Sequence, residues 1–151
     1  PHASPLTPHP SPLAPRPGHL LDVSGLDEAG AAKAWIGAVL GELGETFNDE
    51  ATLHELLRSG TRLCKLVNAV SPGIVSRVND SDRPFVHMEN ISHFTSACTV
   101  LNVVPVFDPP DLYEEKNMKT VVQCIHSLAR AARAGGFGGP LLAPASERMQ
   151  L

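Results

Sequence analysis

The chain has 151 residues, a formal net charge of -4 at pH 7, 42% hydrophobic residues and only 5% aromatic residues. This length suits one domain with tails, and the hydrophobic content is enough for one core. The acidic balance argues against a general nucleic-acid binder or anionic-membrane binder, since both need a strongly basic surface. The scarcity of aromatic side chains favours aliphatic helix packing over a β-sandwich.

No apolar run approaches the roughly 18 residues that a membrane span needs, and no signal peptide is visible. Because the first residue is Pro1 rather than Met, we expect the chain to be a piece of a longer protein. The cysteines Cys64, Cys98 and Cys124 lie among apolar residues and form no CxxC pair. They predict buried thiols in a reducing, cytoplasmic compartment.

Residues 1–25 are expected to form a disordered Pro-rich arm. Proline recurs every few residues over residues 1–17, and each proline fixes φ and removes an amide donor. Residues 5–8 and 12–15 both match PxxP, the pattern of SH3 ligands. A plain low-complexity linker explains the same composition and is the preferred interpretation.

A globular domain is predicted over residues 26–134, beginning with three helices. Asp27 is a suitable N-cap for the first helix, in which apolar residues starting at Trp35 recur on one face. A second helix is expected over residues 49–58. A third follows over residues 61–70, with Thr61 as its cap and apolar residues at i, i+3, i+4 and i+7.

The second half of the domain alternates long connectors with helices. Residues 74–86 are rich in turn formers and predict an irregular connector. A fourth helix is expected over residues 88–102, and prolines then mark a second connector over residues 103–110. Residues 111–115 suit one short helical turn.

The last helix starts near Asn117, carries a strong helical repeat of apolar residues, and ends before Gly135. Residues 135–151 return to Gly, Pro and Ala and predict a flexible tail. The predicted fold class is therefore all-α, a compact helical domain of four main helices with short helical turns and long connectors. No segment shows the alternation typical of a strand.

The order of these segments resembles the calponin-homology (CH) domain. The detail is closest to the single-domain calponin and transgelin type, and the last block has some similarity to the IQGAP type. Five sequence blocks carry the resemblance: AKAWIGAVLGE (Ala32–Glu42), LHELLRSGTRLCKLVNAVSPG (Leu53–Gly73), VND (Val78–Asp80), PFVHMENISHF (Pro84–Phe94) and DLYEEKNMKTVVQCIHSLAR (Asp111–Arg130).

The resemblance implies a binding module of the actin cytoskeleton rather than an enzyme. It implies firm affinity for F-actin mainly in tandem CH pairs or in domains with flanking repeats, and this chain shows neither. One departure lies in residues 59–62, where the family usually has an acidic residue after the glycine. Thr61 can still cap the third helix, so the fold expectation stands.

The expected structural core combines apolar side chains with two asparagines. Trp35 is the largest apolar side chain, and its indole N–H needs a partner if buried. Asn68 and Asn90 lie beside apolar stripes and are expected to tie connectors to helices, because buried amides must be hydrogen-bonded. The core residues are Trp35, Leu63, Leu66, Asn68, Asn90, Ile91, Phe94, Val122 and Ile125.

Two basic clusters are candidate contacts for an acidic filament. The first comprises Arg58, Arg62 and Lys65. The second lies along one edge of the last helix and comprises Lys116, Lys119, Arg130 and Arg133. An ordinary solvated surface is the preferred interpretation of the first cluster, and complementarity to the helix dipole is the preferred interpretation of the second. If the clusters act together, they must share a face with the fourth helix.

The resemblance also places the family's second actin-binding segment on the helix opened by HMENI. Its candidate partner-binding positions are those outside the apolar stripe: His87, Glu89, Ser92, His93 and Ser96. This assignment comes from the resemblance and not from the spacing.

No catalytic, cofactor or metal site is expected. The sequence contains no GxSxG, P-loop, GxGxxG or HExxH motif, and no His and Cys share a helix face.

The predicted function is an actin-cytoskeleton-associated module that binds F-actin modestly or serves as a scaffold for actin regulators. The alternatives are a scaffold or autoinhibitory domain, whose partner could lie in the parent chain, and a microtubule or axoneme module. The expected location is the cytoplasmic cytoskeleton, or the cilium under the last alternative. Nucleic acids and membranes are not expected partners.

Overall fold

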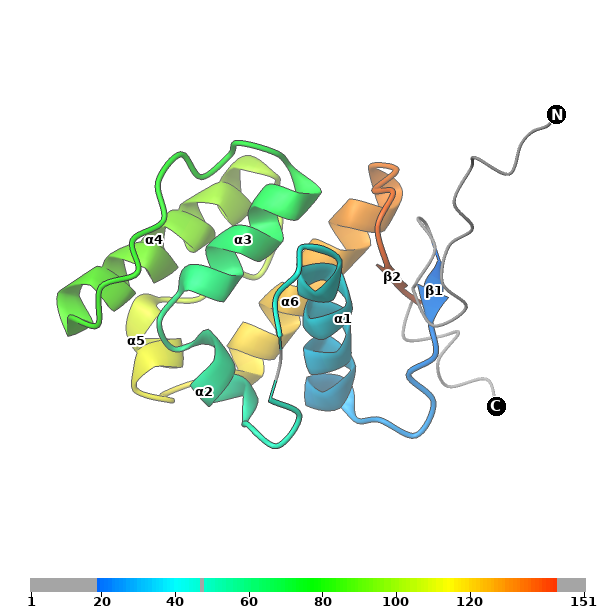
Figure 1. Ribbon diagram of the computed structural model, residues 1–151, viewed down its shortest axis with the longest axis horizontal. Coiled ribbons are helices and arrows are strands. Elements are labelled where there is room, and N and C mark those ends of the chain that lie inside the picture. Colours follow the sequence, from blue (N-terminus) through cyan, green and yellow to red (C-terminus); the bar gives the residue numbers. More distant parts are fainter. Residues whose placement is uncertain (1–18, 47, 144–151) are drawn as a thin grey trace, which may run out of the picture.

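A computed structural model describes residues 19–46 and 48–143 of the chain (Figure 1). Within these residues the fold consists of helices and one pair of very short strands. The helices are α1 (Glu28–Glu42), α2 (Leu53–Leu57), α3 (Thr61–Val70), α4 (Pro84–Val100), α5 (Pro109–Tyr113) and α6 (Met118–Ala134). The strands are β1 (Leu20–Leu21) and β2 (Leu141–Leu142).

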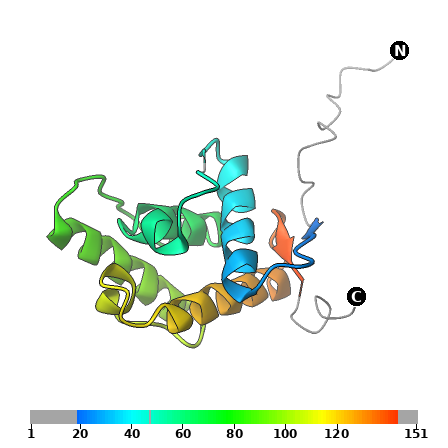
Figure 2. The same cartoon turned by 90° about the horizontal axis from the view of Figure 1, so that it is seen from below.

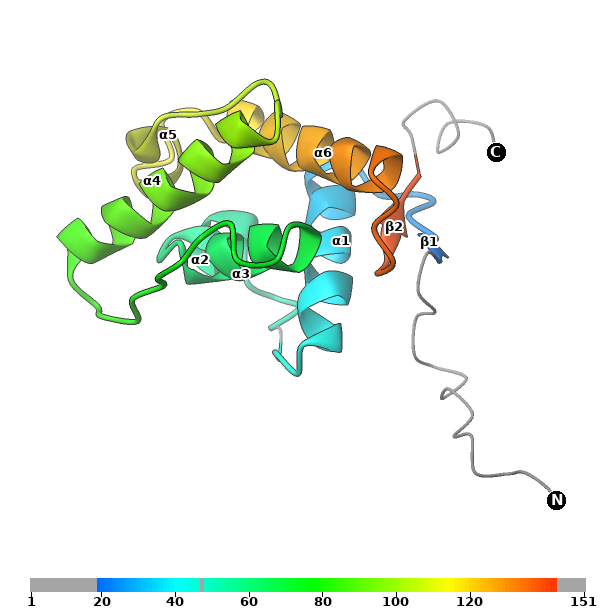
Figure 3. The ribbon, with the colours of Figure 1, turned by 90° about the horizontal axis from the view of Figure 1, so that it is seen from above.

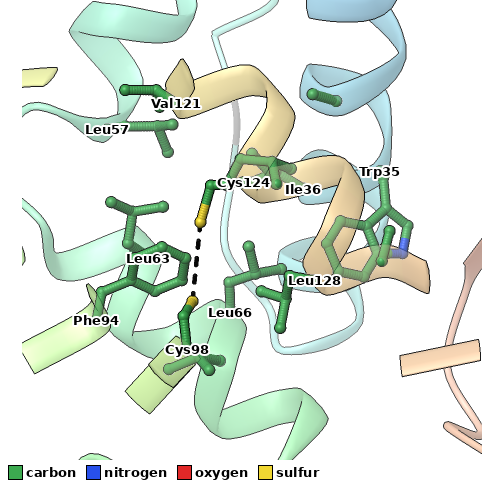
Figure 4. Close-up of a cluster of buried hydrophobic side chains, with 14 of the residues drawn as sticks. Trp35, Ile36, Leu57, Leu63, Leu66, Phe94, Cys98, Val121, Cys124 and Leu128 are labelled. Atoms are coloured by element: carbon green, nitrogen blue, oxygen red, sulfur yellow. Dashed lines mark hydrogen bonds between the residues drawn. The ribbon is translucent and has the colours of Figure 1, made fainter. Parts of the chain in front are cut away.

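The helices pack around one shared hydrophobic core. Helix α3 packs on both α4 and α1, while α5 bridges α4 and α6 (Figure 1). Helix α1 crosses α6 steeply, as the view from below shows (Figure 2). The core side chains come from all the helices and from flanking segments, and they include Trp35, Ile36, Leu63, Leu66, Phe94 and Leu128 (Figure 4). Ile125 belongs to the same core. The prediction of a compact, all-α helical domain is confirmed.

Both long terminal helices start where the sequence indicates. The Asp27 carboxylate accepts a hydrogen bond from the Gly30 N–H at 2.7 Å and caps α1. The Asn117 side chain accepts one from the Thr120 N–H at 3.3 Å and caps α6. Each cap satisfies an amide that the first helical turn leaves without an intrahelical partner.

Helix α2 differs from its expected bounds, whereas helix α3 has the expected bounds but a different cap. Helix α2 begins only after Thr52, because Thr52 and Glu55 form a reciprocal capping box that defines the helix start. Helix α3 includes Thr61 as its first residue. Gly60, in the left-handed region at φ +78°, occupies the N-cap position instead, without a side-chain hydrogen bond.

Helix α4 starts at Pro84, four residues before the expected start, and α5 starts at Pro109, two residues before it. In both cases proline lies at the first helical position, where its missing N–H has no intrahelical partner to lose. Proline is usually expected to end a helix, so the sequence predicts both helix starts too late.

The two ends of the domain also differ from expectation. Strands β1 and β2 pair in parallel on the far side of α1 from α4 (Figure 3). Val23 and Leu142 are buried, and the Trp35 indole Nε1–H donates to the Pro140 carbonyl at 2.9 Å. Residues 19–25 and 135–143 therefore pack on the domain. The remaining arm, with its two PxxP matches, and the end of the tail lie outside the described residues.

No helix in the described part of the chain is long and apolar enough to cross a membrane. In the same part, no group of three or more His, Cys, Asp and Glu side chains is placed to hold a metal ion.

Candidate partner-binding surfaces

The outer face of α4 presents an unusual apolar side chain to solvent. Phe85, in the first turn of α4, is 74% exposed, whereas Phe94 on the same helix is fully buried. Glu89, Ser92, His93 and Ser96 are also exposed along this face. A shallow cleft of about 370 Å³ separates α4 from the start of α5, and its lining residues are Phe85, Met88, Glu89, Ser92, Pro109 and Pro110.

His87 does not belong to this outer face, contrary to the sequence expectation. Its side chain is only 7% exposed and lies against Tyr113 of α5, with the ring centroids 5.8 Å apart. The reason is the helix phase: Val86, His87, Asn90 and Ile91 form one buried stripe once α4 begins at Pro84. His87 therefore packs α4 against α5 and is not available to a partner.

The first basic cluster is largely engaged within the molecule. Arg58 is exposed, but its guanidinium stacks 4.4 Å from the Tyr113 ring centroid and donates to the Tyr113 hydroxyl at 3.0 Å. Arg62 is half-buried and donates to the Leu56 carbonyl at 3.1 Å. Lys65 forms an ion pair with Glu45 at 3.1 Å. These three side chains do not form a patch of unpaired cations.

The second basic cluster divides along α6. Lys116 pairs with Glu114 at 3.4 Å, and Arg133 is half-buried. Lys119 and Arg130 are exposed and line a groove of about 590 Å³. This α6 groove is lined by Glu28, Val104, Pro105, Lys119, Val122, Gln123, His126, Ser127 and Arg130.

Three elements form the walls of the α6 groove. The Ser127 hydroxyl of α6 donates to the Val104 carbonyl at 2.5 Å and holds the connector between α4 and α5. His126 Nε2 lies 2.8 Å from the Glu28 carbonyl oxygen and 3.6 Å from its carboxylate, which joins α6 to α1. Val122 was expected in the core, but it is half-buried and packs at the core's edge beside this groove.

Sequence reasoning did not single out the connector side of the groove. Val104 is 73% exposed, and Pro105 follows it in the same apolar stretch, VVPVF. From sequence alone, such an apolar stretch predicts a partly buried connector. Its exposure at the groove depends on how α6 packs beside it. Among the groove's lining residues, the sequence marks Lys119 and Arg130 as candidate contacts and Val122 as a core residue.

A family model of the calponin homology (CH) domain matches residues 26–134. The chain belongs to the calponin-homology family. This CH domain is 38% identical over 116 residues to Muscle-specific protein 20 of Drosophila melanogaster, covering 75% of the chain and 61% of that protein. It is 34% identical over 123 residues to Myophilin of Echinococcus granulosus, covering 78% of the chain and 63% of that protein.

A third relative is matched over only a small part of its length. Rac guanine nucleotide exchange factor B of Dictyostelium discoideum is 34% identical over 115 residues, 74% of this chain and 9% of that protein. Among solved structures, the CH domain of Rng2 from Schizosaccharomyces pombe matches with a TM-score of 0.63 and 27% identity, over 80% of each chain. The chain thus spans about six-tenths of the first two relatives and a small part of the third.

These matches confirm the resemblance to both the calponin or transgelin type and the IQGAP type. They agree with the prediction of a cytoskeleton-related binding domain rather than an enzyme. The family membership does not identify which face of this CH domain meets a partner, because a fold can support several binding functions.

The two asparagines of this CH domain tie connectors to helices. Asn90, 1% exposed, donates to the Ser59 and Asn79 carbonyls at 3.1 and 2.7 Å and accepts from the Asn79 N–H at 3.3 Å. Asn68, which is half-buried, donates to the Val75 carbonyl at 3.0 Å and accepts from the Val75 N–H at 2.8 Å. Both amides hold the connector between α3 and α4, and Asn90 also holds the turn between α2 and α3.

The three cysteine thiols are buried and form no disulfide. Burial raises the pKa of Cys64 to about 11. Cys98 and Cys124 lie with their sulfur atoms 4.0 Å apart in the core (Figure 4), and this contact, together with burial, raises the pKa of Cys98. Because the thiolate is the reactive form, the raised pKa values make Cys64 and Cys98 poor nucleophiles. All three cysteines are buried and act as small core residues.

Proposed function

We propose that this CH domain is an actin-cytoskeleton-associated binding module and that the outer face of α4 contacts F-actin. The observation that carries the proposal is the 74% exposure of Phe85 at the start of α4. This residue is the second of the PFVHMENISHF block, and the resemblance places the family's second actin-binding segment on the helix that contains HMENI. The similarity to Muscle-specific protein 20 and Myophilin supports a location in the cytoplasmic cytoskeleton.

An exposed phenylalanine is suited to be an anchor in an interface. Burying its ring removes apolar surface from water, which contributes about 1.5–3 kcal/mol. Met88, Pro109 and Pro110 extend the apolar surface around it. Glu89, Ser92 and His93 provide a polar rim of the kind that surrounds interface anchors.

The electrostatics of this face support modest rather than tight binding. Actin filaments are acidic, so cations near α4 would accelerate association and make it sensitive to salt. Arg58 contacts Tyr113 on the neighbouring α5, but Arg62 and Lys65 are already bonded within the domain. We therefore expect apolar contact, and not the first basic cluster, to provide most of the affinity.

The test is cosedimentation of the 151-residue chain with F-actin at low and physiological salt, with microtubules run alongside. Phe85→Ala should raise the dissociation constant for F-actin about fivefold to tenfold, which corresponds to a loss of about 1–1.4 kcal/mol. The matched control is Val100→Ala, because Val100 is 71% exposed at the other end of the same helix. The control should bind F-actin within twofold of the unchanged chain.

Binding of F-actin by Phe85→Ala that is as tight as binding by the unchanged chain would remove the start of α4 from the interface. Pelleting with microtubules but not with F-actin would replace the proposal with the axonemal alternative. No pelleting with either filament would replace it with a scaffold or autoinhibitory role. Circular dichroism of each variant checks that the helical fold is retained.

A further inference from the structure

We propose that the α6 groove is a docking site for an acidic peptide segment of a partner protein, carrying at least one large apolar side chain. The groove lies between α6, the start of α1 and the connector after α4. It shares no lining residue with the α4–α5 cleft. The inference is therefore independent of the proposed contact between α4 and actin.

The groove combines volume with exposed apolar surface. Its volume of about 590 Å³ lies in the range of sites that enclose a few side chains. Val104, 73% exposed, forms an apolar wall together with Pro105 and the half-buried Val122. Covering these three residues with an apolar side chain removes hydrophobic surface from water, which is the main favourable term in most associations.

Charge determines which peptide fits. Lys119 and Arg130 are eleven positions apart on α6, so they flank the apolar wall about 16 Å from each other along the helix axis. Neither forms an ion pair with another described residue within the structure. Glu28 is the one carboxylate among the groove's lining residues, and it lies beside His126. A chain of net charge -4 thus presents a locally cationic groove, which complements an acidic segment.

The same charges argue against occupation by the chain's own N-terminal arm. Residues 1–18 contain Arg16 and no carboxylate, so they would add positive charge to the groove. The groove's walls are also held in place without a ligand. The hydrogen bond from Ser127 to Val104 and the contact of His126 with Glu28 join its three elements. Because the groove is already formed, binding costs little conformational entropy on the side of the domain. The entropy cost of ordering a flexible peptide segment is then the main one to offset.

The experiment selects peptides from a random 12-residue library displayed on phage against the immobilised 151-residue chain. We expect enrichment of sequences that combine Asp or Glu with Leu, Ile, Phe or Trp. The most enriched peptide is then synthesised with a fluorescent label, and its dissociation constant is measured by polarisation. The double reversal Lys119→Glu/Arg130→Glu should raise this constant at least about tenfold, and added salt should raise it for the unchanged chain.

The matched control is Arg77→Glu/Arg83→Glu, which changes the net charge equally at two exposed arginines away from the groove. It should bind the peptide within twofold of the unchanged chain, as should Phe85→Ala. Lys119→Glu/Arg130→Glu should in turn retain F-actin binding, which separates this inference from the proposed function. Enrichment of neutral or basic peptides, no enrichment, or peptide binding unchanged by the groove reversal would each overturn the inference.

Discussion

At the residue scale, Asn90 shows how one polar side chain organises a loop-rich domain. Its amide bonds the end of α2 through Ser59 and the connector before α4 through Asn79. The Cys64 thiol donates to the Asn90 carbonyl from α3 at 3.2 Å. Buried polar groups are costly unless bonded, so this satisfied cluster specifies how α3 and α4 approach each other.

The closest approach in that junction is at Gly60. A Cβ atom on Gly60 would lie 2.6 Å from Asn90 Cβ and 2.8 Å from the Ile91 backbone nitrogen. Gly60→Ala should therefore lower the free energy of unfolding by roughly 3 kcal/mol, from overpacking together with strain at positive φ. Urea denaturation monitored by circular dichroism measures this loss.

Gly44→Ala is the matched control for Gly60→Ala. Gly44 also has a positive φ, +85°, but an added Cβ would meet nothing within 4 Å. This substitution should lower stability by only about 1 kcal/mol, because only the backbone strain remains. Similar losses for both variants would show that the contact with α4 is not tight.

At the element scale, the residues that α4 exposes depend on where the helix begins. Starting the helix at Pro84 rather than at residue 88 adds one turn, and that turn presents Phe85 to solvent. It also turns His87 inward against Tyr113. The sequence placed His87 among the candidate contact residues of this helix, but the structure buries its side chain. The contact itself stays a prediction.

The capping box of α2 gives a prediction about pH. The Thr52 backbone N–H and, second, its hydroxyl hold the pKa of Glu55 below its usual value. A carboxyl with a lowered pKa in the folded state stabilises that state above its unfolded-state pKa. This contribution is lost as the pH falls through the folded-state pKa. The chain should thus exceed Glu55→Gln in urea resistance near neutral pH.

The difference between the chain and Glu55→Gln should shrink as the pH falls and disappear once the pH lies below the lowered pKa of Glu55, where the carboxyl is protonated in both the folded and the unfolded state. Urea midpoints measured across that range provide the readout. Glu89→Gln is a suitable control, because Glu89 is exposed on α4 and caps no helix start. A difference that persists unchanged into acid would mean that the charge on Glu55 is not the cause.

At the scale of the whole molecule, the folded unit extends beyond the residues that match the family. The matching segment covers residues 26–134, but Val23 and Leu142 belong to the core, and Pro140 accepts the Trp35 indole hydrogen bond. The β1–β2 pair joins the two ends of the unit beside α1 (Figure 3). These contacts close the core where α1 and α6 cross.

A fragment of residues 26–134 should therefore be less stable than residues 19–143 by roughly 4 kcal/mol. This sum combines the burial of Val23 and Leu142 with the hydrogen bond of Trp35. Thermal and urea unfolding of both fragments measures the difference. In the whole chain, Leu142→Ala should cost about 2–3 kcal/mol and Leu20→Ala, at an exposed position of the same ladder, below about 1 kcal/mol. Equal stability of the two fragments would show that the terminal pair adds nothing to the core.

The sequence by itself determined the features that depend on local periodicity. The caps Asp27 and Asn117 and the apolar repeats of α1, α3 and α6 require only neighbouring residues, so the helices and the family blocks were readable in order. The prolines at the starts of α4 and α5 were ambiguous, since proline both ends and begins helices.

Only the tertiary structure decided which basic side chains remain free of partners within the described part of the domain and where the two ends of the folded unit pack. Lys65 pairs with Glu45, and Arg58 stacks on Tyr113, far away in the chain, whereas Lys119 and Arg130 line a groove with Val104. The tail pairs with β1 through Leu141 and Leu142. Each of these outcomes depends on residues brought together by helix packing across many intervening positions, which no local pattern encodes.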